Sequence, residues 1–344
     1  MYINTGVLYY YMIKCIILFF ILHYVRGFNS RECRTQSTET WLCDYMEKHN
    51  KVYSSWSEFV YRGNMLRNVP KGPHYGLTSK SDVFYHEMSS NTAFAFGHHK
   101  SLERSSHLLH KHKEAVPALS PIDWRTTGRV TYVKDQGDCG ACFAFASTAV
   151  LEFWEGEHPK SLSAQNTMDC TSGTDRPNVG CDGGLMEYVF DYAKKHPIVL
   201  RQDFPFKKKQ NRCPRHHLTS NVAVQEYRVL MIDDNPKAEQ QLEHLLHEYG
   251  PVSVGIDSSK MNNYNGGIFP ASECTNDIDH AVTIVGYTED AWIIKNSWGK
   301  YWGEEGYLRL ERGKNACGVA EYIVYVKSAV PTHKKMSTVW HKYV

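Results

Sequence analysis

The stretch Asp135-Gln-Gly-Asp-Cys-Gly-Ala-Cys-Phe-Ala-Phe-Ala146 places Cys139 and Cys142 three positions apart, in a loop that leads into a predicted helix. From Cys142 to Glu155, aromatic and apolar residues recur at helical intervals. A C-x-x-C pair can be a redox couple, half of a metal site, or one structural cysteine beside one nucleophile. Because a helix N-terminus favours a thiolate, Cys142 at the first turn is a candidate nucleophile.

The N-terminus has the layout of a secretory signal. The unbroken apolar run 15–22 follows Lys14 and precedes a polar stretch, which predicts a signal over residues 1–27 with cleavage between about Val25 and Ser30. Alternatively, residues 7–25 form one membrane span interrupted by Lys14, and the signal is an anchor. We expect the chain to enter the secretory pathway and to be secreted, lysosomal or vacuolar.

The number of cysteines bears on the role of Cys142, because the secretory pathway is oxidising. Three of the ten cysteines, Cys15, Cys33 and Cys43, precede residue 118, which leaves seven in the rest of the chain. These seven are Cys139, Cys142, Cys170, Cys181, Cys213, Cys274 and Cys317. Since seven is odd, a disulfide framework in this region leaves one thiol unpaired.

Composition and charge exclude some function classes. The 344 residues are 42% hydrophobic and 22% charged, which is ordinary for a globular protein with ample core in one large domain or two small ones. The formal net charge is +2, so nothing favours a polyanionic partner. We therefore expect no nucleic-acid partner.

The order of predicted elements suggests a chain folded in two halves. Residues 28–117 show few strand patterns and one short helix over 55–68, whereas the pattern is dense from Ile122 onward. Further helices are predicted over 142–155, 166–170 and 185–194, and from a cap at Asn235-Pro236 to a stop at Gly250-Pro251. Strands are predicted over 223–230, 252–256, 281–287, 291–294, 307–310 and 322–326. Helices followed by strands predict an α+β fold, with a possible cleft between the halves.

Three polar residues could assist a nucleophilic thiol. His280 immediately precedes a predicted strand that would hold it rigidly, and Asn296 follows the next strand as a candidate orienting partner. Asp279 is a weaker orienting candidate, because adjacent strand residues point to opposite faces. Gln136 lies six residues before Cys142, so its side-chain amide and the Cys142 N–H could together stabilise an oxyanion.

These residues belong to six motifs that occur in a fixed order. The motifs are Gln136-Gly-Asp-Cys-Gly-Ala-Cys142, Leu162-Ser-Ala-Gln-Asn-Thr-Met-Asp-Cys170, Gly180-Cys-Asp-Gly-Gly-Leu-Met186, Asp279-His280-Ala281, Asn296-Ser-Trp-Gly299 with Trp302-Gly303, and Cys317-Gly-Val319. The combination resembles the papain-like cysteine proteases, nearest to their cathepsin L-like members, and runs from about Ile122 to Val326. It implies a two-lobed fold with a helical left lobe, a β-barrel-like right lobe and the active site in the cleft between them.

The resemblance implies a role for each candidate catalytic residue. Cys142 would be the nucleophile, His280 the general base and acid, Asn296 the orienting residue and Gln136 an oxyanion donor. The implied reaction is peptide-bond hydrolysis through an acyl-enzyme, with no metal or organic cofactor. Trp298 would shield the His–Asn pair from water.

The resemblance also implies the disulfides and the substrate-binding residues. The implied pairs are Cys139–Cys181, Cys170–Cys213 and Cys274–Cys317, which leave Cys142 free. Gly183 and Gly184 would bind the substrate backbone. The pocket for the second residue before the scissile bond (P2) would be lined by Leu185, Met186, Gly255, Ile278 and Tyr322. An apolar wall with Tyr322 at the floor predicts an aliphatic P2 residue, such as Leu or Val, rather than Arg.

The remaining segments match a zymogen. Residues 28–117 resemble the inhibitory propeptide of the family in a degenerate form, with Glu58, Arg62, Gly76 and Asp82 matching its motifs. The resemblance implies removal of this segment near residues 116–119, a catalytic domain over 118–326 and a tail over 327–344. Expected partners are protein or peptide substrates, the chain's own propeptide and cystatin-like inhibitors, and the enzyme is expected to be a monomer.

Two other functions compete with an endopeptidase. Phe143 replaces the Trp that usually follows the nucleophile, so the chain could be a catalytically silent homologue that acts as a binding protein. A thiol–disulfide oxidoreductase would need both Cys139 and Cys142 free to cycle. His216-His217 is similar to a loop that gives some relatives exopeptidase activity, but the surrounding insertion is absent and endopeptidase action is expected.

Overall fold

The structure is a computed structural model that describes residues 28–37, 40–53, 119–173, 176–214, 220–232 and 238–332, with Phe59, Arg62, Leu66, His74 and Thr78. It divides into two compact units, Met1–Val69 and Pro70–Val344, each of which is described by itself. Several predicted features lie outside the described residues: the signal over 1–27, Glu58, Gly76, Asp82, His216-His217, the Asn235-Pro236 cap and the tail from 333.

In the first unit, two short helices have described bounds, α2 (Ser30–Gln36) and α3 (Thr40–Lys48). The Asn29 side chain accepts hydrogen bonds from two backbone N–H groups of the first turn of α2, and the Glu32 carboxylate accepts from the Asn29 N–H, which makes a capping box. The disulfide Cys33–Cys43 joins the two helices. Neither helix was predicted from the sequence. Of the predicted helix over 55–68, only Phe59, Arg62 and Leu66 are described, and each is helical.

The helices of the second unit begin where apolar residues start to recur at helical intervals in the sequence. Its α-helices are α7 (Cys142–Phe153), α8 (Ala164–Thr171), α9 (Met186–Lys195) and α10 (Ala238–Tyr249). Its 3₁₀ turns are η3 (Trp124–Thr127), η4 (Gly180–Asp182), η5 (Ala271–Glu273) and η6 (Ala316–Gly318). Helix α10 buries Leu242, Leu245 and Leu246 on one face and ends at Tyr249, directly before Gly250. Gly250 has φ +84°, and an added Cβ would lie 2.3 Å from the Phe153 ring, so both conformation and space require glycine there.

The strands of the second unit form one large mixed sheet. They are β1 (Ile122–Asp123), β4 (Ile198–Val199), β5 (Ser220–Met231), β6 (Val252–Ile256), β7 (Ile268–Phe269), β8 (His280–Tyr287), β9 (Ala291–Lys295), β10 (Tyr307–Glu311) and β11 (Tyr322–Pro331). The strand order is β4-β5-β11-β6-β8-β9-β10-β7, with β1 paired to β8, and only the β10–β7 pair is parallel. A two-stranded sheet joins β2 (Ser172–Gly173) and β3 (Arg176–Pro177). Among the described residues no pairing links β4 with β7, so the expected barrel-like lobe is an open sheet and not a closed barrel.

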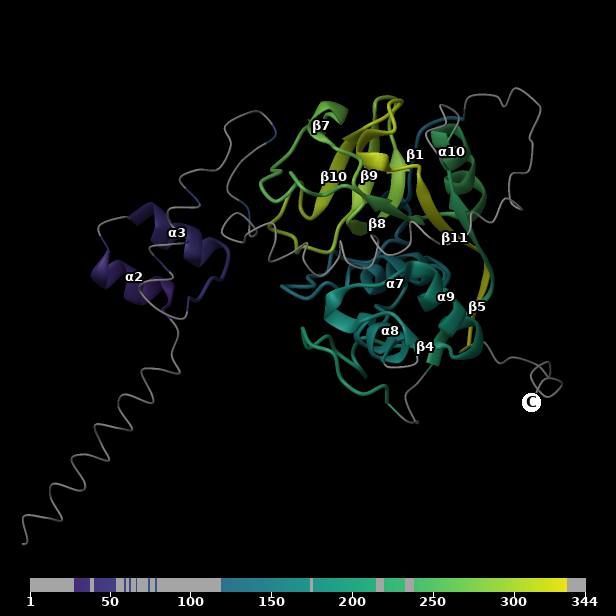
Figure 1. The fold of residues 1–344 in the computed structure, drawn as a ribbon, viewed down its shortest axis with the longest axis horizontal. Helices are drawn as coiled ribbons and strands as arrows, with labels where there is room; N and C mark the ends of the chain where they lie inside the picture. Colours follow the sequence, from purple (N-terminus) through teal and green to yellow (C-terminus); the bar gives the residue numbers. More distant parts are fainter. Residues whose placement is uncertain are drawn as a thin grey trace, which may run out of the picture. The chain divides into compact units, whose positions relative to one another are not determined.

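The buried side chains of the second unit form two cores, as expected for a two-lobed fold. One core surrounds α7, α8 and α9, and the other fills the space between α10 and the strands. Figure 1 shows α7, α8 and α9 grouped together, with β8, β9, β10 and α10 above them in this view. The long β5–β11 pair extends past α9 (Figure 1). Thr283 of β8 donates a hydrogen bond to the Ala146 carbonyl of α7 at 3.1 Å, which holds the two lobes together.

The predicted elements agree with the observed ones except at their ends. All six predicted strands and the four helices after residue 122 are present within a few residues of the expected bounds. The largest difference is β11, which was predicted to end at Val326 and instead continues to Pro331 against β5. Its register shifts around Ser328, and this bulge interrupts the alternation by which a strand is recognised in a sequence. The first residues of the predicted tail therefore belong to the sheet.

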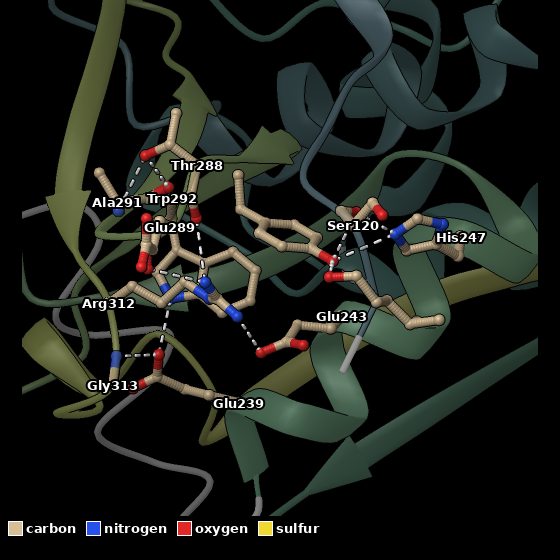
Figure 2. Close-up of polar contacts among 12 residues, drawn as sticks. Ser120, Glu239, Glu243, His247, Thr288, Glu289, Ala291, Trp292, Arg312 and Gly313 are labelled. Atoms are coloured by element: carbon tan, nitrogen blue, oxygen red, sulfur yellow. Dashed lines mark hydrogen bonds and ion pairs between the residues drawn. The ribbon is translucent and has the colours of Figure 1, made fainter. Parts of the chain in front are cut away.

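The chain enters the second lobe through a polar anchor at the far end of β8. The Tyr287 hydroxyl lies 3.2 Å from the Leu119 carbonyl oxygen and 3.0 Å from that of Ser120, and His247 Nε2 lies 3.0 Å from the Ser120 oxygen. The Arg312 guanidinium lies over the Tyr287 ring and donates to Glu243 (Figure 2). These contacts fix the described residues that immediately follow the expected processing region.

Within the described part of the chain, no helix combines the length and the apolar character needed to cross a bilayer. Residues 1–27, on which the signal or anchor prediction depends, are outside that part.

Candidate active site

Disulfide pairing separates the two cysteines of the opening motif. Cys139 is bonded to Cys181, and the other two pairs are Cys170–Cys213 and Cys274–Cys317, as the family resemblance implies. Among the described cysteines only Cys142 is a free thiol. Since Cys139 is held in a disulfide, it cannot cycle with Cys142, and the structure contradicts the redox-pair reading.

Cys142 is the first residue of α7, at the end of the helix where backbone N–H groups lack intrahelical acceptors. The cap residue Ala141 provides no side-chain acceptor for them. Burial raises the pKa of the Cys142 thiol to about 11, although the N–H groups of Ala281 and Phe143 oppose this by donating toward the sulfur. The helix terminus alone therefore does not make this thiol a thiolate at neutral pH. A positive charge beside the sulfur is required.

The β8–β9 hairpin supplies an imidazole and its orienting amide. His280 begins β8 and Asn296 follows β9, and the antiparallel register pairs Thr283 with Lys295, which brings the two ends of the hairpin together. His280 Nε2 lies 2.8 Å from Asn296 Oδ1, which also accepts the Ser297 N–H at 2.7 Å. Because Oδ1 only accepts, the proton of this bond is on Nε2. The hairpin thus fixes both the orientation and the tautomer of His280.

The position of His280 relative to Cys142 follows from its neighbour in the chain. The Ala281 N–H lowers the pKa of the Cys142 thiol, so the residue after His280 lies near that sulfur. The His280 and Asn296 side chains are almost completely buried. The structure therefore gathers Cys142, His280 and Asn296 at the junction of α7 with the sheet.

Aromatic rings cover the imidazole. The Trp298 ring lies 4.8 Å from the His280 ring, centroid to centroid, at an interplanar angle of 31°. Trp302 packs edge-on against Trp298 at 5.0 Å and donates its indole N–H to the Met261 carbonyl. The two tryptophans exclude solvent from the His280–Asn296 hydrogen bond.

Gln136 is held on both ends of its amide. Its Oε1 accepts the Ser297 hydroxyl at 2.5 Å, and its Nε2 donates to the Cys139 carbonyl at 2.9 Å. The Gln136 backbone N–H also donates to the Ser297 carbonyl. Ser297 is a residue that sequence reasoning missed, although it lies inside the quoted Asn296-Ser-Trp-Gly motif. The Ser297 hydroxyl therefore joins the loop before α7 to the segment that follows β9.

Asp279 is used differently from Asn296. Its Oδ1 accepts hydrogen bonds from the Ser258 N–H at 2.8 Å and the Ser258 hydroxyl at 2.9 Å. Burial raises the pKa of the Asp279 carboxyl to about 7, against these stabilising hydrogen bonds. Asn296, as expected from strand geometry, is the residue that binds His280 Nε2.

The loop before α9 presents bare backbone beside the nucleophile. An added Cβ at Gly184 would lie 2.5 Å from the Asn178 side chain and 2.9 Å from the Phe143 ring, so no larger residue fits. The Gly140 N–H donates to the Cys181 carbonyl, which ties this loop to the one that carries Cys142. Gly183 has φ +114°, a conformation that favours glycine.

The expected pocket residues lie in two groups that meet at Tyr322. An added Cβ at Gly255 would lie 2.6 Å from Ile278 and 3.1 Å from the Tyr322 ring, so these three residues are in contact. The Met186 N–H donates toward the Tyr322 hydroxyl, and that hydroxyl donates to Glu187. Met186 and Leu185 are buried. Glu187 was not foreseen as part of this group.

A buried charge cluster beneath the site was also missed by the sequence analysis. The Lys134 amine pairs with the Glu152 carboxylate, Thr131 donates to the same carboxylate, and Lys295 donates to Thr131 at 2.9 Å. Burial and the Lys134 charge lower the pKa of the Lys295 amine to about 7, although Glu152 opposes this. The polar residue Lys295 at the end of the apolar run Ala291-Trp-Ile-Ile294 was the available signal. Among the described residues, no group of His, Cys, Asp and Glu side chains could hold a metal ion.

Comparison with known proteins agrees with this geometry. Residues 119–327 match the papain family cysteine proteases. A cathepsin L-like protein of Caenorhabditis elegans is 33% identical over 82% of this chain and 89% of its own length. Cathepsin L of Sarcophaga peregrina is 34% identical over 71% of this chain and 76% of its own. The structure of digestive procathepsin L 3 from Tenebrio molitor larval midgut superposes with a TM-score of 0.70 at 26% identity, over 85% of this chain and all of that one.

Proposed function

Because the chain belongs to the papain family of cysteine proteases and is cathepsin L-like, we propose that Cys142, His280, Asn296 and Gln136 hydrolyse peptide bonds through a thiol acyl-enzyme. One observation carries the proposal. The single free thiol among the described cysteines lies at the start of α7, against the N–H of the residue that follows an oriented histidine.

In the acylation step, His280 Nδ1 takes the proton from the Cys142 thiol while Nε2–H stays bonded to Asn296. The thiolate attacks the peptide carbonyl carbon, and the carbonyl π electrons move to the oxygen. The Cys142 N–H and a Gln136 Nε2–H donate to that oxyanion. His280 then gives its proton to the leaving amine, and the C–N bond breaks to leave a thioester.

In the deacylation step, His280 takes a proton from water, and the resulting hydroxide attacks the thioester carbonyl. The C–S bond breaks, the acid product leaves, and the thiolate–imidazolium pair is restored. The positive charge of the imidazolium in this pair also offsets the effect of burial, which raises the pKa of the Cys142 thiol. An imidazolium within a few ångströms in a water-excluded site favours the thiolate strongly, and Trp298 keeps water from that pair.

Substrate selection is proposed to rest on an apolar P2 pocket and a polar backbone contact. Gly183 and Gly184 would bind the substrate main chain, because the backbone conformation at Gly183 favours glycine and a side chain at Gly184 is excluded. Leu185, Met186, Gly255, Ile278 and Tyr322 would line the P2 pocket, with the Tyr322 ring closing its end. A short apolar pocket accepts Leu or Val, whereas an Arg guanidinium would lose its water among apolar side chains, which is costly.

The zymogen proposal has support within the second unit. The Thr78 hydroxyl donates to the Asn262 carbonyl at 2.6 Å, the Asn265 N–H donates to the His74 carbonyl at 2.8 Å, and His74 Nδ1 lies 3.2 Å from the Gly266 oxygen. The part of the proposed propeptide that contains His74 and Thr78 would thus inhibit by docking on the loop over 262–267. Protein substrates and this propeptide are the proposed partners, together with cystatin-like inhibitors.

The zymogen proposal also gives the boundaries of the other segments of the chain. Residues 1–27 are proposed as the signal, removal of the propeptide is placed near Leu119, and the catalytic domain extends through β11 to Pro331, with the tail after it. We propose a monomer that enters the secretory pathway and is secreted or delivered to a lysosome or vacuole.

The decisive experiment compares the acid-activated wild-type zymogen with the Cys142→Ala variant on a peptide substrate with Leu at P2. Wild type is expected to hydrolyse the substrate and to lose activity with a thiol-directed epoxide, while Cys142→Ala is inactive. Hydrolysis that survives in Cys142→Ala would refute the mechanism. An activated wild type that neither cleaves nor reacts with the epoxide is the silent homologue. Fastest cleavage with Arg at P2 in a peptide library would refute the pocket proposal alone.

A further inference from the structure

Tyr322 connects the two lobes at the closed end of the proposed P2 pocket. It is the first residue of β11, yet its side chain packs in the helical core, whereas the next residue, Ile323, packs in the core of the sheet lobe. Figure 1 shows β11 running beside β5 toward the helical lobe. The Tyr322 side chain is 6% exposed, so its hydroxyl requires partners within the protein.

Among the described residues, the Tyr322 hydroxyl contacts the first turn of α9. The hydroxyl donates to Glu187 Oε2, and its oxygen receives the Met186 N–H. The residue before the helix, Leu185, offers no side-chain acceptor. The phenol oxygen of another element therefore takes the place of a helix cap, and the Glu187 carboxylate lies where the helix dipole favours a negative charge.

The protonation states of Tyr322 and Glu187 favour the hydrogen bond between them. Burial raises the pKa of the Tyr322 phenol well above its ordinary value, so the hydroxyl keeps its proton and remains a donor. Burial also raises the pKa of the Glu187 carboxyl, and the hydrogen bond from Tyr322 opposes that shift. A hydrogen bond to a carboxylate is stronger than one between neutral groups. The pair therefore restrains the ring more than packing alone would.

The restraint acts beside two other residues of the proposed pocket, Gly255 and Ile278. The Tyr322 ring lies against Gly255 and near Ile278, with so little room that one added methyl group at Gly255 would clash. Rotation of the ring away from these residues would lengthen the pocket, but such rotation breaks the bond to Glu187. Glu187 thus decides whether the floor can move.

We propose that Glu187 is a specificity-determining positioning residue, which holds the Tyr322 ring as a fixed floor and so excludes a long aromatic P2 side chain such as Phe while admitting Val and Leu. This inference rests on the proposed protease function and on the assignment of Tyr322 to the P2 pocket. Glu187 itself does not touch the substrate.

The test uses peptide amides that differ only in Val, Leu or Phe at P2, and the readout is the ratio of kcat/KM for Phe to that for Val. Glu187→Leu removes the acceptor at similar volume and is expected to raise this ratio about tenfold, on the scale of one hydrogen bond to a charged group. Glu187→Gln should raise it less, because the amide oxygen still accepts the phenol hydrogen. Tyr325→Phe, on the same strand, is the matched control and should leave the ratio unchanged.

A second variant separates positioning from general stability. Tyr322→Phe removes the same bond from the other side, so it should raise the ratio too, and Glu187→Leu should add little in the Tyr322→Phe background. A lowered melting temperature with an unchanged ratio in both single variants would overturn the inference. If wild type cleaves nothing, or if Cys142→Ala still cleaves, the protease proposal fails instead. The bond itself is then tested by coupling of the two substitutions in thermal unfolding, and additive melting shifts would refute it.

Discussion

The hydroxyl of Ser297 offers a sharp test of the proposed oxyanion site. Ser297 is buried and donates to Gln136 Oε1 at 2.5 Å, while Gln136 Nε2 faces the loop that carries the nucleophile. The substitution Ser297→Ala removes only this hydroxyl, since the backbone hydrogen bond between the two residues stays. Gln136 keeps its place in the chain but loses the contact that fixes the plane of its amide.

The size of the effect follows from the role of Ser297 as a support. Removal of an oxyanion donor itself costs about 10²- to 10³-fold in kcat, and this is the expectation for Gln136→Ala. Loss of a supporting neutral hydrogen bond costs about 0.5–1.5 kcal/mol, which corresponds to a rate loss of roughly 2- to 13-fold. The loss should appear in kcat rather than in KM, because the oxyanion forms only in the transition state.

The assay is steady-state hydrolysis of one peptide amide, with active enzyme counted by titration with a thiol-directed epoxide. Ser253→Ala is the matched control, because the Ser253 hydroxyl is buried but has no hydrogen-bond partner among the described residues. Ser253→Ala should leave kcat unchanged.

A double-mutant cycle provides the refutation. If Ser297 acts through Gln136, then Ser297→Ala has almost no further effect in the Gln136→Ala background. Additive losses would show that Ser297 supports the site by another route. A kcat loss for Ser297→Ala as large as that for Gln136→Ala would also refute the assignment of a supporting role.

Three further predictions test the pocket, a buried carboxyl and the N-terminal anchor. Gly255→Ala places a methyl group 2.6 Å from Ile278, so it should raise KM severalfold for a substrate with Leu at P2 and less for one with Ala, as measured in steady-state kinetics. Asp279 has a folded pKa near 7 against 3.8 for its ordinary value, so the folded state binds the extra proton and stability falls as pH rises from about 4 to 7. Asp279→Asn should flatten this fall in urea unfolding, and an unchanged slope would contradict the assignment. Tyr287→Phe removes the hydroxyl near the Ser120 carbonyl, so faster amide exchange should be confined to the first residues of the domain.

Local patterns in the sequence predicted several residues of the candidate site. Cys142, His280 and Asn296 each follow from a recognisable context: a helix start, a strand start and a strand end. The register of the β8–β9 hairpin then places His280 near Asn296, because antiparallel pairing brings the start of β8 near the end of β9. The odd cysteine count was informative for the same reason, since it depends on composition and compartment rather than on tertiary contacts.

The missed features depend on contacts that no local pattern encodes. The Ser297–Gln136 bond joins residues 161 positions apart, and the Tyr322–Glu187 bond joins residues 135 apart. Helix α2 was missed because a capping box and a disulfide define it rather than an apolar face. Helix α3 does bury Leu42, Tyr45 and Met46, and that pattern was overlooked. The end of β11 was misplaced because its bulge breaks the period of two.

The hydroxyl contacts of Thr283 and Tyr322 between the lobes are expected to have separate consequences for function. Thr283 of β8 binds the carbonyl of Ala146, one turn into α7, and so fixes the nucleophile's helix against the strand that begins with His280. Tyr322 of β11 donates to Glu187 at the start of α9, and we propose that this bond fixes the floor of the P2 pocket. Strand β6 lies between β8 and β11 in the sheet, so the two contacts are on different strands and reach different helices. The proposed mechanism and the proposed P2 pocket therefore depend on different parts of the lobe interface, and we expect a substitution at one contact to change one property while leaving the other in place.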